Sequence, residues 1–226
     1  MNRFLYINGS PRGEKGSSSA LILEDIREIL KQEGGTEEQV QSLTLPRKTG
    51  SSDSAILKKM EESDVWILAL PLYIDVLPGH LTWWLREYQT FREALPDKKN
   101  IRVYGVVNCG FPEAVQNADA LRVLKLFCRK SGLEWRFGIG LGMGEPYKQM
   151  HGIPLQSGMK KEILNSYKAI AADLQKKDTS DFGDFYVRIR YPKFLYKIQG
   201  AFGWVFRARQ NGLKKRDLYA RPLLEA

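Results

Sequence analysis

The sequence has few of the residues on which many extracellular and metal-binding proteins depend. Only two cysteines, Cys109 and Cys128, occur in 226 residues, which is too few for a disulfide framework or a paired-cysteine metal site. The two histidines, His80 and His151, likewise argue against a histidine-based metal site or catalytic triad. The scarcity of cysteine favours a reducing, cytoplasmic compartment.

Long hydrophobic runs are also missing from the sequence. The N-terminus has no apolar stretch of the kind found in secretory signal peptides, so none is expected. The charge-free residues 65–74 are too few to span a bilayer and include Pro71. With 43% hydrophobic residues, the chain is expected to bury one full core and to have room for an appendage.

Negative charge is scarce relative to positive charge, most clearly near the C-terminus. The net charge is +9, and residues 178–226 contain ten Lys or Arg against five Asp or Glu. Less than a quarter of the chain therefore carries more than half of the excess. We predict two regions, a domain formed by residues 1–177 and a basic, aromatic-rich C-terminal extension formed by residues 178–226.

Apolar and amphipathic segments alternate as far as residue 177. Continuous apolar runs are typical of strands in a parallel sheet that is covered on both faces. The segments between them carry apolar residues at helical spacing. The sequence therefore predicts an α/β fold, a doubly wound five-stranded parallel sheet with helices on both faces. The predicted strands are residues 3–7, 38–45, 65–70, 101–107 and 135–141.

The loop after the first predicted strand has the composition of a phosphate-binding site. Ligands of such sheets bind beyond the carboxyl ends of the strands, and the free N–H groups of a helix N-terminus attract anions there. Ser17, Ser18 and Ser19 begin an amphipathic helix, and Ser10 and Arg12 precede it. We expect the serine hydroxyls to bind phosphate oxygens and the arginine to add a charged contact. The alternative is a helix cap with an ordinary surface turn.

The loop after the third predicted strand combines rigid and apolar residues. Pro71 and Pro78 restrict its backbone, and Leu72, Tyr73 and Ile74 lie between them. A rigid apolar and aromatic wall at a strand end suits a flat heteroaromatic ring. The alternative is a packed loop in which the tyrosine covers apolar surface.

The loop after the fourth predicted strand offers polar groups and a close approach to the backbone. Asn108 provides an amide, Gly110 lets a ligand come near the main chain, and Phe111 follows. Cys109 is expected to be a small buried residue rather than a nucleophile, because no histidine is nearby in the sequence. Residues 140–145, at the end of the fifth predicted strand and just beyond it, are glycine-rich but do not have the spacing of a dinucleotide fingerprint.

In this order, the motifs resemble those of the flavodoxin-like NAD(P)H-dependent FMN reductases. The resemblance implies FMN, with its phosphate in the first loop and its ring against the backbone of residues 72–74 and 108–111. It also implies that the flavin carries the chemistry, so no catalytic side chain is assigned. Residues 43–53 contain no cysteine, which excludes the iron–sulfur centre of some members of the wider group.

The resemblance implies an FMN-dependent oxidoreductase that takes electrons from NADH or NADPH and passes them to a quinone, flavin, nitro-compound or similar acceptor. It also implies a homo-oligomer, a dimer or higher. The main alternative is a flavodoxin-type electron-transfer protein that does not use NAD(P)H directly. Such proteins usually present acidic surfaces, so the net charge of +9 argues against it. A regulatory or membrane-tethered flavoprotein is a third hypothesis, supported by the extension alone.

Within the extension, residues 185–206 hold eight aromatic residues interleaved with basic ones. Apolar residues there recur on one face of a predicted helix, which Asn211 and Gly212 would end. We favour docking of this helix on the main domain or on a partner subunit. Peripheral contact with a membrane is the second possibility, and nucleic-acid binding is the least favoured. The apolar face consists of Phe194, Ile198, Ala201, Phe202, Val205 and Phe206.

Overall fold

The computed structural model describes residues 2–14, 16–34, 37–47, 53–175 and 182–220. Contacts divide the chain into two compact units, Met1–Ile189 and Arg190–Ala226. The predicted boundary between residues 177 and 178 lies outside the described residues, and the first unit continues beyond it.

A fully parallel sheet forms the centre of the first unit, with the strand order β2-β1-β3-β4-β5-β6. The inner strands β3 and β4 are buried along almost their whole length because helices cover both faces of the sheet. The strands are β1 (Asn2–Asn8), β2 (Glu37–Thr44), β3 (Val65–Pro71), β4 (Arg102–Asn108), β5 (Glu134–Gly142) and β6 (Phe185–Arg188).

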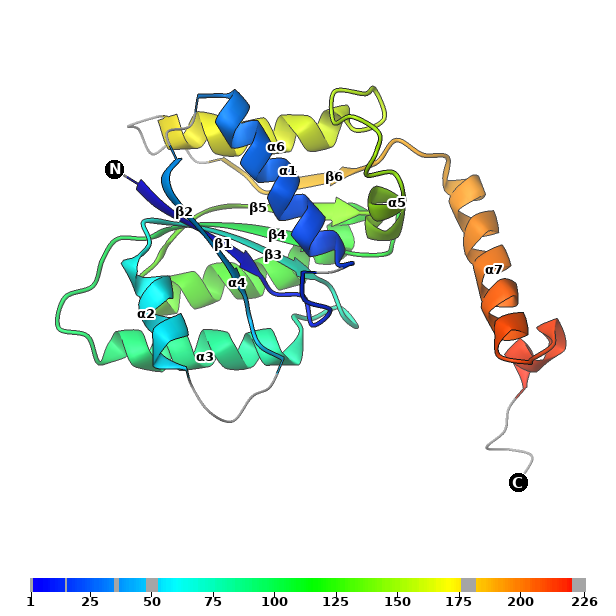
Figure 1. Cartoon of the computed structure of the whole chain (residues 1–226), viewed down its shortest axis with the longest axis horizontal. Helices are drawn as coiled ribbons and strands as arrows, with labels where there is room; N and C mark the ends of the chain where they lie inside the picture. Colours follow the sequence, from blue (N-terminus) through cyan, green and yellow to red (C-terminus); the bar gives the residue numbers. More distant parts are fainter. Residues whose placement is uncertain (1, 15, 35–36, 48–52, 176–181, 221–226) are drawn as a thin grey trace. The chain divides into compact units, whose positions relative to one another are not determined.

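Two layers of helices enclose the sheet (Figure 1). One layer consists of α1 (Ser18–Gln32) and α6 (Lys161–Gln175), which pack against each other. The opposite layer consists of α2 (Ser54–Glu62), α3 (Gly79–Glu93) and α4 (Ala118–Ser131). Two short helices lie in the connections, η1 (Ala114–Asn117) and α5 (Gly144–Gln149).

Local sequence signals account for several helix ends. Ser17 caps α1, and its hydroxyl accepts a hydrogen bond from the Ala20 N–H. Gly132 ends α4 in the left-handed conformation with φ +66°, which glycine adopts readily. Between the sheet and the layer formed by α2, α3 and α4, the side chains of Trp66 and Trp84 are almost completely buried in the hydrophobic core.

The sheet has six strands, so the prediction of five is wrong. The sixth strand, β6, pairs in parallel with β5 along Phe185–Arg188, within the predicted extension. Asp184 supports the pairing, because its carboxylate accepts a hydrogen bond of 2.6 Å from the Gly138 N–H. Ile189 follows β6 and is fully buried. The first unit is therefore larger than the charge pattern predicts.

The second unit consists of α7 (Lys193–Gln210) followed by the 3₁₀ helix η2 (Lys215–Tyr219). Asn211 is the C-cap of α7, and Gly212 follows with φ +74°. Within the described part of the chain, none of the helices has the length and apolarity needed to cross a membrane.

Candidate functional site

Four loops lie along one edge of the sheet, beyond the carboxyl ends of β1, β3, β4 and β5. This edge includes the switch point between β1 and β3, where the strand order reverses and ligands of doubly wound sheets bind. Backbone hydrogen bonds tie the first residue after β1, β3 and β4 to the neighbouring strand. They run from Gly9 N to Ala69 O (2.8 Å), from Leu72 N to Asn108 O (2.8 Å) and from Cys109 N to Leu141 O (2.9 Å).

Asn8 organises the loop between β1 and α1. Its Nδ2 donates to Gly13 O (3.0 Å), and its Oδ1 accepts from Ser10 N (3.0 Å). The loop then enters α1, whose first-turn amides at Ser18 and Ser19 have no acceptor inside the helix. The positive end of the α1 dipole therefore faces a loop whose shape is held by hydrogen bonds.

The serines predicted to bind phosphate differ in their accessibility. Ser10, Ser17 and Ser19 are buried, and Ser19 Oγ accepts a hydrogen bond of 3.0 Å from Asn108 Nδ2. Ser18 is half-buried and donates to Gly144 O (3.1 Å), whereas Arg12 is exposed. The buried hydroxyls thus hold the loop together, and a direct role in ligand binding stays a prediction for all five residues.

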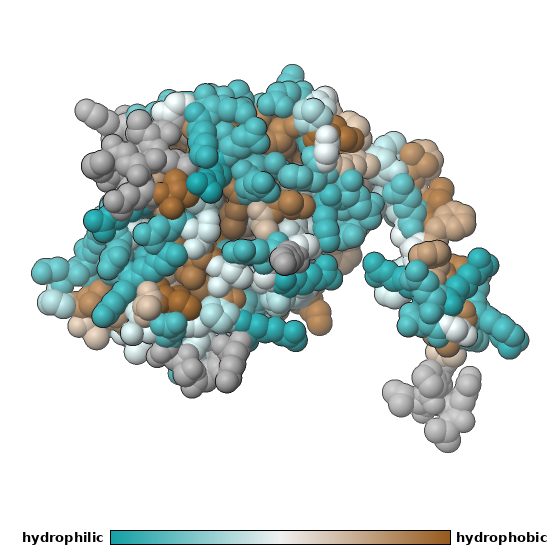
Figure 2. All heavy atoms as spheres, viewed as in Figure 1, coloured by the Kyte–Doolittle hydropathy of each residue, from teal (hydrophilic) through white to brown (hydrophobic). Residues whose placement is uncertain are grey.

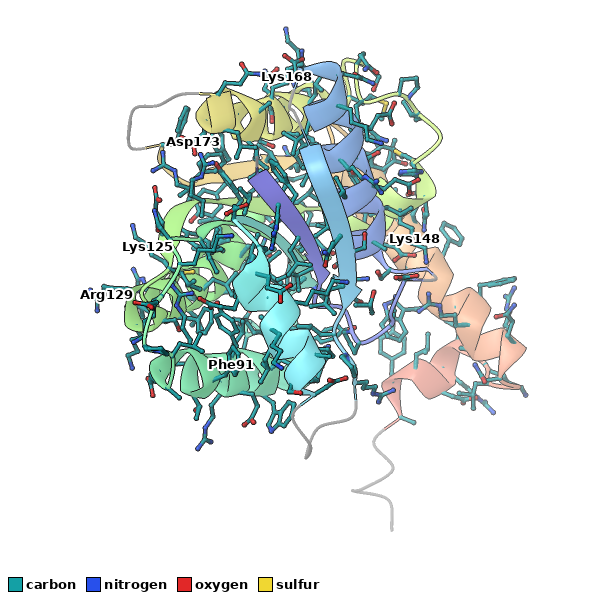
Figure 3. The ribbon with its side chains drawn as sticks, turned by 60° about the vertical axis from the view of Figure 1, so that its left-hand side comes forward. Phe91, Lys125, Arg129, Lys148, Lys168 and Asp173 are labelled. Atoms are coloured by element: carbon teal, nitrogen blue, oxygen red, sulfur yellow. The ribbon has the colours of Figure 1, made fainter. Side chains whose placement is uncertain are left out.

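Lys148 adds a cation to this loop that the sequence analysis missed. Its Nζ donates to Gly16 O (2.7 Å), so the side chain lies beside the β1–α1 loop (Figure 3). No local motif identifies this lysine, because it follows Gly16 by 132 positions. Its position depends on α5 folding back toward the start of α1.

A buried polar cluster anchors α5 against α1. The hydroxyl of Tyr147 donates to the carboxylate of Asp25 and lies 3.3 Å from the hydroxyl of Tyr167. Burial raises the pKa of Asp25, although hydrogen bonding by Tyr147 and the nearby His151 act in the opposite direction. Because Tyr147 precedes Lys148, this cluster fixes the position of the lysine.

The loop after β3 contains a strained turn. The N–H and C=O groups of Tyr73 and Val76 pair reciprocally, at 3.0 and 3.1 Å. Between them, Ile74 and Asp75 have φ of +48° and +60°, as in a type I′ turn. A left-handed conformation costs a non-glycine residue about 1–2 kcal/mol, and the isoleucine is 96% exposed, so burial does not compensate. Strain of this kind is typical of functional sites.

The remaining residues of this loop differ in exposure. Tyr73 is exposed, whereas Pro71 and Leu72 are half-buried. The turn therefore presents an aromatic and an aliphatic side chain at the strand end, on a backbone held by the ladder to β4.

Asn108 connects three elements at the end of β4. Its Nδ2 donates to Leu70 O (2.9 Å) as well as to Ser19 Oγ, which ties β4 to β3 and α1. Cys109 is buried, and burial raises the pKa of its thiol, which does not favour a nucleophilic thiolate. Gly110 and Phe111 are exposed beyond it.

Comparisons with known proteins bear on the fold. No family model matches the sequence, and a search of curated proteins finds no match. Solved structures, however, share the architecture of the first unit. An oxidoreductase from Corynebacterium diphtheriae aligns over 76% of this chain and 94% of its own, with 14% identity and a TM-score of 0.56.

Two further structures are similar. General stress protein 14 from Treponema denticola, in complex with FMN, aligns over 76% of this chain and 99% of its own, with 20% identity and a TM-score of 0.51. An NADPH-quinone reductase from P. pentosaceus aligns over 75% and 97%, with 17% identity and a TM-score of 0.50. The chain has a flavodoxin-like fold. At these identities, the similarity establishes the fold of this chain rather than its activity.

Proposed function

We propose that this chain is an FMN-dependent oxidoreductase that takes hydride from NADH or NADPH and passes electrons to a small-molecule acceptor such as a quinone, a flavin or a nitro-compound. The observation that carries the proposal is the convergence of an anion-binding loop and an apolar wall at the β1/β3 switch point. Flavodoxin-like sheets bind FMN at this position. The Treponema protein, which shares the fold, is described as a complex with FMN.

The β1–α1 loop has the chemistry that a phosphate monoester needs. The first-turn amides of α1 and the helix dipole favour an anion, and Arg12 and Lys148 supply positive charge. Glu14 lies in the same loop, but its carboxylate accepts a hydrogen bond of 3.2 Å from Thr44 Oγ1. We infer that this loop would hold the FMN phosphate.

The loops after β3 and β4 have the chemistry that a flavin ring needs. Tyr73, Ile74 and Phe111 are exposed apolar side chains on adjacent loops, joined by the Leu72–Asn108 hydrogen bond. A bound flavin supplies hydride acceptance and electron transfer, while the protein orients the ring and excludes water. In this proposal the chain needs no acid or base of its own.

A comparison of FMN with riboflavin tests the phosphate end, because riboflavin lacks the phosphate. We expect the purified chain to bind FMN more tightly than riboflavin. Lys148→Gln should weaken FMN binding by about tenfold, the value of one charged contact, and leave riboflavin binding unchanged. Lys125→Gln is the matched control, because Lys125 is exposed on α4, on the opposite side of the first unit in Figure 3. Equal affinities for the two flavins would contradict the assigned phosphate site.

Anaerobic addition of nicotinamide nucleotides tests the reaction. If the FMN-loaded protein is an oxidoreductase of this class, NADH or NADPH should bleach the flavin absorbance. Bound flavin that neither nucleotide bleaches would favour the electron-transfer alternative. Failure to bind FMN after reconstitution would refute both hypotheses.

A further inference from the structure

In the second unit, Arg190–Ala226, the described residues leave much of an apolar face of α7 exposed, although η2 covers part of it. Residues at helical spacing along α7 form this face, and Ala208 is the sole residue of α7 that is buried. In Figure 2, brown and tan atoms run along α7, with teal atoms around its C-terminal half. The largest exposed fractions on the face belong to Phe194 (63%), Ile198 (47%), Phe202 (71%) and Phe206 (62%).

Basic residues flank this face at both ends. Lys193 and Lys197 lie in the first turns of α7, Arg207 and Arg209 lie in its last turn, and the helix contains no acidic residue. Three further basic residues, at positions 214–216, follow in and before η2. Over the whole unit, nine Lys or Arg stand against two Asp or Glu, so its charge favours a polyanionic partner.

A groove between α7 and η2 adds aromatic residues to the same unit. It has a volume of about 570 Å³, and its lining includes Trp204, Lys215, Leu218 and Tyr219. The side chains of Trp204 and Tyr219 are 66% and 77% exposed. Tryptophan and tyrosine combine an apolar ring with a polar group, which suits the boundary between lipid headgroups and acyl chains.

We propose that the second unit binds the surface of a membrane rich in anionic lipids, with α7 lying in the plane of the interface. An interfacial helix of this kind buries an apolar face among the acyl chains and places its Lys and Arg among anionic headgroups. An anionic membrane surface thus provides acyl chains for Phe202 and Phe206 and headgroup charges for the flanking cations.

Charge and hydrophobicity together argue against two other partners, a second copy of the unit and nucleic acid. A second copy of the unit would cover the apolar face but bring two strongly basic segments together. A nucleic-acid duplex would neutralise the cations through its phosphates but leave Phe202, Trp204 and Phe206 in water. Membrane binding of this unit requires no flavin, so its test is independent of the proposed reaction.

Vesicle sedimentation tests this proposal with the full chain. We expect the protein to pellet with vesicles of equimolar phosphatidylcholine and phosphatidylglycerol, and to stay in solution with phosphatidylcholine alone. The double variant Phe202→Glu/Phe206→Glu should reduce the partition coefficient by about tenfold or more, because it places two charges on the inserted face. Val123→Glu/Leu126→Glu is the matched control, since these exposed apolar residues lie on α4 of the first unit.

A second variant separates binding from any effect on folding. Lys214→Gln/Lys215→Gln/Arg216→Gln changes exposed residues only and should weaken pelleting, as should high salt. Equal binding to neutral and anionic vesicles, or no binding to either, would overturn the proposal. A salt-stable dimer that the double phenylalanine variant dissociates, without vesicle binding, would assign the face to a second copy instead. A shift of DNA or RNA mobility without vesicle binding would assign it to nucleic acid.

Discussion

Asn108→Ala should both destabilise the first unit and weaken ligand binding at the candidate site. The side chain is 6% exposed, and its Nδ2 donates to Leu70 O at 2.9 Å and to Ser19 Oγ at 3.0 Å. A buried hydrogen bond contributes about 1 kcal/mol, and partners left unsatisfied add to the loss. We therefore expect the free energy of unfolding to fall by about 2–3 kcal/mol, measured by urea denaturation without ligand.

The matched control is Asn100→Ala. The amide of Asn100 makes a single hydrogen bond, to Glu134 Oε2 at 2.9 Å, and it is exposed to solvent. Its loss should change the free energy of unfolding by less than about 0.5 kcal/mol. If Asn108→Ala were no more damaging than this control, the loops would not depend on that amide, and its role in holding β3, β4 and α1 together would be wrong.

Two other substitutions test the strained turn and a buried ion pair. Ile74→Gly should raise the free energy of unfolding by about 0.5–1 kcal/mol in urea denaturation, because relief of left-handed strain exceeds the added chain entropy of glycine. Burial alone would raise the pKa of Asp173, but hydrogen bonds from Arg136 and Tyr104 outweigh it and lower this pKa. The carboxylate therefore contributes stability above its unfolded pKa that is lost as pH falls through its folded pKa. Asp173→Asn should cost about 2 kcal/mol near pH 7 and progressively less below pH 4, measured by denaturation at each pH.

The sequence predicts the central sheet well because its inner strands are buried on both faces. Residues 65–70, a continuous apolar run, form β3 (Val65–Pro71) almost to the residue. The edge strand β6 is different. Val187 points into the core while Tyr186 is exposed, so its four residues alternate and include Arg188. A short alternating segment with aromatic and basic residues has no pattern that separates it from the basic extension that follows.

The candidate site is predictable to the extent that it consists of loops at strand ends. Parallel topology alone brings the loops after β1, β3 and β4 to one edge of the sheet. The order of residues in the sequence is therefore enough to place Ser18, Tyr73 and Phe111 at that edge. The contacts that hold these loops in place could not be predicted from the sequence. Ser19 contacts Asn108 across 89 positions and Lys148 contacts Gly16 across 132 positions, and hydrophobic periodicity does not encode contacts at such separations.

Rigidity at this edge has a physical consequence for ligand binding. Because Asn108 and the backbone ladder already fix the loops after β3 and β4, little conformational entropy remains to be lost when a flat ring binds there. The phosphate end depends on a longer chain of contacts, since Lys148 is positioned through α5 and the buried pair of Tyr147 and Asp25. Removing the hydrogen bond between Tyr147 and Asp25 should therefore weaken FMN binding while leaving riboflavin binding unchanged. Removing the hydrogen bonds of Asn108 should weaken the binding of both flavins. The two flavins thus distinguish a lost phosphate contact from a disordered site.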